Sequence, residues 1–288
     1  MVRLGSNRYG KAEVRVVHVA RSEGSDDLIR DWTVSSALSG DVAACYLTGD
    51  NASVLTTDAQ KNTVYGFSQR LGDIEPEAFA TALAEHFVAT QEPITRARVA
   101  VLEHPWARIG TLPHSFARTG AHTRSTVVIH DAEQGTSVVG GVEDLVVLNT
   151  TNSEFWGFPR DEYTTLPETQ DRMLATQVSA SWRFASTPAD WGAAFDTALA
   201  TLLATFGGTY SYSLQQTLYA IGEAIIGAVP EICEVRLVLP NKHHFLVDLT
   251  PFGQGNDNEV YYAADRPYGL IEGQVLADDA PPEGLAWT

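Results

Sequence analysis

Four short segments carry side chains that could act together on a ligand. Lys11 opens a predicted strand, in a chain that has only three lysines. The polar run 56–63 (TTDAQKNT) stands where a strand gives way to a helix, and free backbone N–H groups at such a junction bind an electron-rich ligand. Segment 153–166 places three aromatic residues around Gly157, which suggests a wall for stacking. Segment 239–245 (LPNKHHF) gathers amide, ammonium and imidazole groups at a strand start.

Three of the four segments also have a purely structural explanation, which the residues alone leave open. The run 56–63 suits an ordinary helix cap, the aromatic residues of 153–166 suit a core anchor, and 239–245 suits a solvated turn. A metal site at His243 and His244 is not expected, because neighbouring residues on a strand point to opposite faces and cannot both bind one ion.

The apolar periodicity predicts the elements that position these segments. Strands are expected at 12–20, 29–38, 97–104, 125–130, 137–148, 178–184, 234–239, 243–249, 259–262 and 270–275. Helices are expected at 58–71, 76–87, 189–206 and 214–229. Asp58 is predicted to be the capping acid of the first helix, and Pro76 to open the second.

Each half of the chain therefore has the pattern strand–strand–helix–helix–strand–strand. This pattern predicts an α+β protein with an antiparallel sheet and helices on one face. We expect a structural duplication, with one repeat at 1–131 and a second at 132–277. Residues 278–288 are expected to form a flexible tail.

The composition bounds the class of protein. The 288 residues include 19 basic and 36 acidic side chains, and a net charge of −17 repels phosphate backbones, so no nucleic-acid partner is expected. No apolar run is long enough to span a membrane, and the amino end lacks the apolar stretch of a signal peptide. Two cysteines are too few for a disulfide framework or a thiolate zinc cluster. A soluble, cytoplasmic protein is expected. The scarcity of lysine fits adaptation to a salt-rich cytoplasm and biased codon usage equally well.

Taken together, the four segments resemble signature segments of the urate oxidase (uricase) family. YGK, TTDAQKNTVYGF, NSEFWGFPRDEYTTLPETQDR, SLQQTLY and LPNKHHFLVDL occur in the family's order and at compatible spacing, and DRPYGLIE from Asp265 resembles its closing strand. The resemblance runs from about Val2 to Gly273. The stretch 103–121 departs from the family pattern, and the peroxisomal tail of eukaryotic members is missing. The resemblance implies tandem tunnelling-fold (T-fold) repeats, and a homotetramer that forms a barrel around a tunnel.

The resemblance also implies a role for individual residues. Lys11, Thr57 and His243 would form the catalytic relay. The purine ring would stack on Phe155, and Asn241 would lie above the ring, where dioxygen or water binds. The residues with an implied substrate-binding role are Asp58, Phe155, Leu166, Arg172, Leu214, Gln215 and Asn241. The family uses no metal or other cofactor, and its active sites are shared between subunits.

These residue types suit urate, a flat anion with alternating carbonyl and N–H groups. Arg172 offers a planar fork of donors and Gln215 offers one donor and one acceptor, so the two can pair with its edge. Urate itself supplies the electrons to dioxygen, so the protein has only to move protons and hold the reactants. The implied products are 5-hydroxyisourate and hydrogen peroxide.

Two other functions stay open on the residues alone. One is a different tunnelling-fold purine or pterin enzyme, such as a cyclohydrolase, although such enzymes commonly use zinc and the two cysteines here are far apart. The other is a protein that binds purines without turnover. The presence of Lys11, Thr57 and His243 together disfavours it, because stacking and pairing need none of them.

Overall fold

The computed structural model describes residues 2–21, 26–120, 122–264 and 266–288. These residues form two compact units. The first comprises the described residues of Met1–Gly141, Trp182–Phe195 and Pro281–Thr288, and the second comprises those of Val142–Ser181 and Asp196–Ala280.

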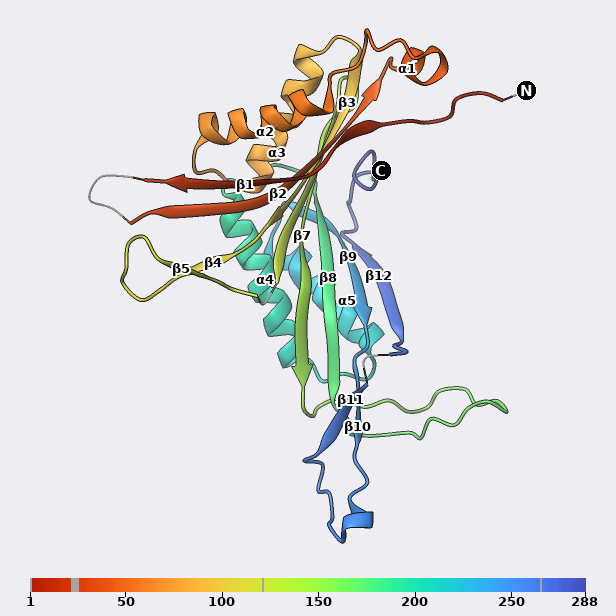
Figure 1. The fold of residues 1–288 in the computed structure, drawn as a ribbon. Coiled ribbons are helices and arrows are strands. Elements are labelled where there is room, and N and C mark those ends of the chain that lie inside the picture. Colours follow the sequence, from red (N-terminus) through yellow and green to blue (C-terminus); the bar gives the residue numbers. More distant parts are fainter. Residues whose placement is uncertain (1, 22–25, 121, 265) are drawn as a thin grey trace. The chain divides into compact units, whose positions relative to one another are not determined.

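The first unit is an antiparallel sheet covered on one face by two helices (Figure 1). Its strands, in spatial order, are β1 (Tyr9–Ala20), β2 (Leu28–Gly40), β3 (Ile94–Glu103), β6 (Thr123–Asp131) and the start of β7 (Gly135–Asn149). The helices are α2 (Thr57–Leu71), which packs on β1, and α3 (Pro76–Thr90), which packs on β3 and β6. Large apolar side chains from both layers fill the space between them, including Trp32, Phe79, Leu83 and Phe87.

The second unit also consists of sheet strands with a helix packed on them. Its strand order is β7, β8 (Leu174–Phe184), β9 (Ile232–Pro240) and β12 (Leu270–Leu276), and α5 (Leu214–Ala228) packs on β9 and β12. The approach of helix to strand is close, because a Cβ at Gly273 would lie 2.7 Å from Leu218 Cδ2. Helix α4 (Trp191–Gly208) starts in the first unit and continues in the second. A hairpin of β10 (His243–Leu246) and β11 (Tyr261–Ala264), with a short 3₁₀ turn at Thr250–Phe252, follows β9.

The predicted α+β class, with an antiparallel sheet and helices, is confirmed. Two regions were missed. Helix α1 (Ala43–Thr48) has six residues and no side-chain cap, and the hairpin of β4 (Trp106–Arg108) and β5 (Phe116–Arg118) has three-residue strands, so neither produces a periodic signal. The predicted end of the strand at 243–249 was also wrong, since β10 ends at Leu246.

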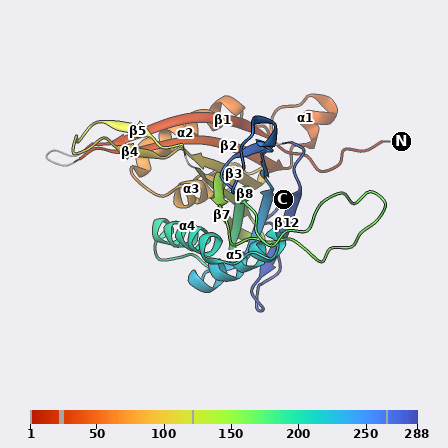
Figure 2. The same ribbon diagram turned by 90° about the horizontal axis from the view of Figure 1, so that it is seen from below.

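The β4–β5 hairpin occupies most of the stretch 103–121, which departs from the family pattern. Ala121, the last residue of that stretch, lies outside the described residues. Figure 2 shows the hairpin beside the ends of β1 and β2. Trp106 Nε1 donates to the Asp31 carboxylate at 3.0 Å, and Arg108 Nη2 donates to the Asp27 carbonyl at 2.6 Å. These contacts anchor the hairpin to β2.

The division into repeats at residue 132 stays a prediction. The compact units divide the chain differently, because β7 and β8 each begin in one unit and end in the other. The tail 278–288, expected to be flexible, contributes buried side chains at Leu285 and Ala286. Arg183 Nη2 also donates to the Pro281 carbonyl at 2.9 Å, an anchor that the sequence did not reveal.

No helix in the described part of the chain is long and apolar enough to cross a bilayer.

Candidate active site

Lys11 lies beside an irregularity in β1. The pairing of β1 with β2 shifts register between Lys11 and Val14, and Glu13 has a positive φ of 57°. The Glu13 N–H donates to Ser35 Oγ at 2.9 Å, which holds the bulge in place. Bulges re-aim the side chains beside them and are frequent next to active sites.

The cross-strand partner of Lys11 shows which face of the sheet it occupies. Lys11 pairs with Ser36, whose hydroxyl is buried and donates to Gln60 Oε1 of α2 at 2.8 Å. Directly opposed residues in an antiparallel pair share a face, so Lys11 lies on the face that α2 covers.

Thr57 and Asp58 are the first two residues of α2, and both are exposed. The Asp58 carboxylate accepts from Lys61 Nζ at 2.5 Å and from Asn62 Nδ2 at 3.0 Å. The hydrogen bond and charge of Lys61 hold the pKa of Asp58 below its usual value, and the positive charge of Lys11 contributes in the same direction. The structure thus places Thr57 and Asp58 in the first turn of α2, with the charge of Lys11 acting on Asp58.

The prediction that Asp58 caps α2 is wrong, because the capping residue is Thr56. Thr56 Oγ1 accepts from the Ala59 N–H at 3.1 Å. Thr56→Ala is therefore expected to lower the free energy of unfolding by about 1 kcal/mol, the usual cost of losing such a cap. Urea denaturation would measure it, with Thr90→Ala in the last turn of α3 as control. A loss for Thr56→Ala no larger than that for Thr90→Ala would contradict the assignment.

Two residues that the sequence analysis did not single out support this half of the site. Gln60 is fully buried, and its Nε2 donates to the Leu55 carbonyl at 3.3 Å. Tyr9 Oη accepts from the Leu55 N–H at 3.0 Å. Together they fix the chain just before Thr57. A signal for Gln60 was present, since it precedes Val64 by one helical turn on the apolar face of α2.

Phe155 and Arg172 meet in the second unit, at the base of the loop between β7 and β8. Phe155 and Thr169 exchange backbone hydrogen bonds of 2.9 and 3.0 Å, which closes the loop. The Arg172 N–H donates to the Ser153 carbonyl at 2.8 Å, and Arg172 Nε donates to Ser153 Oγ at 3.3 Å. The guanidinium carbon of Arg172 lies 5.2 Å from the centroid of the Phe155 ring. An aromatic face and a fork of donors are therefore held side by side.

The Arg172 guanidinium is half-buried, and among the described residues no carboxylate forms an ion pair with it. Burial lowers its pKa from the usual value. A desolvated cation without a carboxylate partner is a strong site for an anionic ligand.

His243 lies within electrostatic reach of Arg172. Burial, then the positive charge of Arg172, then that of His244, lower the pKa of His243. The His243 ring stacks on the ring of Phe245, with 5.7 Å between the two ring centroids. His243 and His244 are consecutive residues of a regular strand, so they do point to opposite faces. Among the described residues, no group of three or more histidine, cysteine or acidic side chains could hold a metal ion.

Asn241 is fixed between two segments of the second unit. Its N–H donates to the Gly269 carbonyl at 2.8 Å, and it forms a bridge with Thr176 of β8. The next N–H, of Lys242, donates to the Ala175 carbonyl at 2.8 Å. The short turn from β9 into β10 is thereby held beside β8, with Asn241 two residues before His243.

Gln215 is exposed in the first turn of α5, which Ser213 caps. The segment before this helix is tied to the segment before Phe155, since the Glu154 N–H donates to the Ser211 carbonyl at 2.8 Å. Leu214 is buried, and Leu166 is half-exposed in the β7–β8 loop. No described contact joins Leu166, Leu214 or Gln215 to Arg172.

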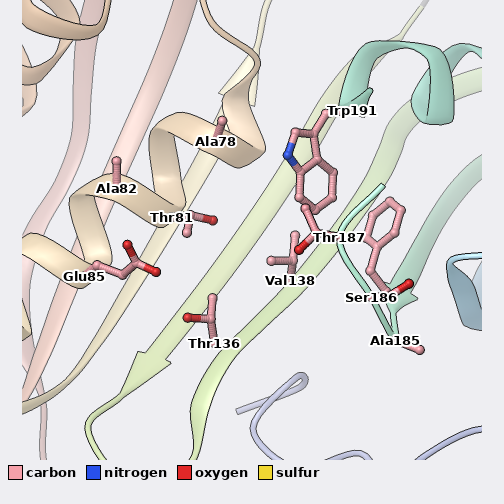
Figure 3. A pocket seen from close by; sticks show the side chains of 11 residues that line it. Ala78, Thr81, Ala82, Glu85, Thr136, Val138, Ala185, Ser186, Thr187 and Trp191 are labelled. Atoms are coloured by element: carbon pink, nitrogen blue, oxygen red, sulfur yellow. The ribbon is translucent and has the colours of Figure 1, made fainter. Parts of the chain in front are cut away.

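The ten predicted site residues thus form two groups. Lys11, Thr57 and Asp58 belong to the first unit, and the other seven belong to the second. The first unit has a cavity of about 550 Å³, and Figure 3 shows side chains that line it. It is bounded by α3, β7 and Trp191. Among the described residues that line it, Glu85 is the one titratable side chain, and none is a predicted site residue.

Comparisons with known proteins show the family of the chain. The model of the family described as Uricase matches residues 7–129 and 138–272. A uricase of Arthrobacter globiformis is 48% identical over 286 residues, which cover 99% of this chain and 93% of that protein. A uricase of Dictyostelium discoideum is 37% identical over 280 residues, which cover 96% of this chain and 98% of that protein. The crystal structure of uricase from Arthrobacter globiformis superposes with a TM-score of 0.94 over 98% of this chain and 97% of that one. The chain belongs to the uricase family.

Proposed function

We propose that this chain is a urate oxidase, which converts urate, dioxygen and water into 5-hydroxyisourate and hydrogen peroxide. The proposal rests on the half-buried Arg172 in a chain of the uricase family. Its guanidinium lies beside the ring of Phe155, and it forms no ion pair with a carboxylate of the described residues. This pair offers what a flat anion needs, a stacking face and a charged fork.

Binding comes first in the proposed mechanism. The purine ring stacks on Phe155, and Arg172 donates two hydrogen bonds to one edge of the ring. Gln215 adds one donor and one acceptor at that edge. Asn241 lies over the opposite face of the ring, where dioxygen and then water are held.

Proton transfer then makes urate electron-rich. Lys11 activates the Thr57 hydroxyl, which removes a proton from bound urate, and His243 passes the proton onward. Two electrons leave the urate dianion for dioxygen, which takes up two protons and becomes hydrogen peroxide. Water then adds to the oxidised ring and gives 5-hydroxyisourate. Urate is oxidised by two electrons and dioxygen is reduced by two, so the reaction balances without a metal or organic cofactor.

The assembly is part of the same proposal. We infer a cytoplasmic homotetramer in which every active site draws one group of residues from each of two chains. Lys11, Thr57 and Asp58 would come from one chain, and the residues of the second unit from its neighbour. The two groups belong to different compact units of the chain, which is compatible with this arrangement.

The proposal is tested by incubating the chelator-treated protein with urate in air. We expect the ultraviolet band of urate to disappear, with one dioxygen consumed and one peroxide released for each urate. Binding of urate without its consumption would identify a purine-binding protein instead. Turnover that vanishes on exhaustive chelation and returns with one metal would refute the cofactor-free reaction.

The pH dependence gives a separate prediction. The pKa of His243 lies below its ordinary value of 6.5, so the neutral imidazole persists to a lower pH. Because protonated His243 cannot accept a proton, kcat/KM should fall on the acid side with an apparent pKa below 6.5. His244→Gln removes one positive neighbour and should move this acid limb to higher pH. The pH–rate profiles of the wild type and of His244→Gln measure the two acid limbs. A wild-type acid limb with an apparent pKa above 6.5 would contradict the role of His243.

A further inference from the structure

Basic side chains gather on the face of the first unit's sheet that the helices do not cover. Arg96 and Arg98 of β3 are two residues apart, so they share a face, opposite to that of the buried Ala97 and Val99. That buried face packs against α3. Arg96 and Arg98 therefore lie on the face away from the helices, whereas Lys11 lies on the face that α2 covers.

The two arginines have different neighbours across the sheet. Arg96 pairs with Asp131 on β6, and its Nε donates to that carboxylate at 2.8 Å. Arg98 pairs with Ile129 on β6 and with Ala37 on β2. The sequence thus supplies a carboxylate for Arg96 and none for Arg98.

Arg8 adds a second positive charge beside Arg98. Burial lowers the pKa of Arg98, and the like charge of Arg8 lowers it further. Among the described residues, no carboxylate forms an ion pair with the side chain of either arginine. Two neighbouring arginines without a carboxylate partner among the described residues are unusual in a chain of net charge −17, where acidic side chains outnumber basic ones almost twofold.

A cavity of about 590 Å³ is lined by Arg8, Arg96 and Arg98, together with the last residues of β2 and Thr288. The segment that carries Arg8 is held in place, since Ser39 Oγ donates to the Asn7 carbonyl at 3.1 Å. The Tyr46 hydroxyl donates to the Arg8 carbonyl at 3.3 Å. Asn7 also lines the cavity, and its Oδ1 is a buried acceptor that has no hydrogen-bond partner among the described residues.

We propose that Arg8, Arg98 and Asn7 form a binding site for an oxyanion that keeps a proton, of which hydrogenphosphate is the simplest. The two guanidinium groups supply donors to the anionic oxygens. The P–OH group donates to Asn7 Oδ1, which satisfies the buried acceptor. Sulfate has the same shape but no proton at neutral pH, and methyl phosphate is largely without one, so both leave Asn7 unsatisfied.

The test uses the full-length protein and titration calorimetry at pH 7.5 and constant ionic strength, with inorganic phosphate, methyl phosphate and sulfate as probes. We expect saturable binding of phosphate, and weaker binding of the other two anions. Arg98→Gln should weaken phosphate binding by about 10- to 100-fold, the scale of a lost hydrogen bond to a charged group. Arg21→Gln makes the same charge change on an exposed residue beyond the far end of β1, and should leave the affinity within about twofold.

Thermal stability separates a binding role from a structural one. Without added anion, Arg98→Gln should match or exceed the wild-type melting temperature, because it relieves the repulsion from Arg8. With phosphate, the wild type should gain more stability than the variant. The proposal is overturned if the wild type shows no saturable phosphate binding, if sulfate binds as tightly as phosphate, or if Arg98→Gln binds phosphate as the wild type does. A melting temperature lowered equally with and without phosphate would also overturn it, because Arg98 would then be structural.

Discussion

Replacing Lys11 with methionine is expected to slow urate turnover by about 10²–10⁴-fold, the usual scale for the loss of a positioned acid–base group. Methionine keeps an unbranched stem of similar shape but can neither take up nor release a proton. Stacking on Phe155 and pairing with Arg172 are untouched, so the affinity for a non-reacting purine analogue should be largely kept. Steady-state oxygen consumption and analogue titration measure the two effects separately.

Lys11→Arg distinguishes proton transfer from charge alone. Arginine retains the positive charge beside Asp58, but its guanidinium stays protonated in proteins. We expect this variant to be nearly as slow as Lys11→Met. Activity close to that of the wild type would mean that Lys11 acts only through its charge.

Arg172→Ala is expected to have its main effect on binding. It removes the half-buried fork and leaves the Phe155 ring, so the affinity for a purine analogue should fall by about 10²-fold, the scale of two lost charge-assisted hydrogen bonds. Arg172→Lys keeps the charge without the fork and should recover only part of the affinity. Calorimetry with the analogue is the measurement. Small and equal effects from Lys11→Met and Arg172→Ala would show that the site has been placed on the wrong residues.

The parts of the fold that carry a long periodic pattern could be predicted from the sequence. Val64, Phe67 and Leu71 mark the buried face of α2, and the predicted strands at 12–20 and 29–38 correspond to β1 and β2. The cap of α2 could not be fixed in this way. Thr56, Thr57 and Asp58 are all residues that cap helices, and only the backbone geometry shows that Thr56 does so.

The features that hold the candidate site residues in place depend on contacts between segments that are distant in the sequence. The bulge beside Lys11 arises from the pairing of β1 with β2, and the polar bond between Ser36 and Gln60 joins a strand to a helix. Neither can be read from a local pattern. Likewise, Arg172 and His243 are 71 residues apart in the chain, and their proximity follows from the path of β8, β9 and β10.

In the proposed assembly, one active site is built from the two groups of residues, contributed by two chains. Lys11→Met and Arg172→Ala subunits should each be nearly inactive as pure assemblies. When the two are unfolded together in equal amounts and refolded, some sites receive an intact Lys11 from one chain and an intact Arg172 from the other.

The urate-oxidising activity of the refolded mixture is the most direct measurement. Random assembly should restore about a quarter of the wild-type activity, because each site draws its two halves independently in a symmetric oligomer. Mass spectrometry of the intact assemblies confirms that mixed oligomers have formed. If mixed oligomers are present and no activity returns, Lys11 and Arg172 act within one subunit, and the shared site is wrong for this protein.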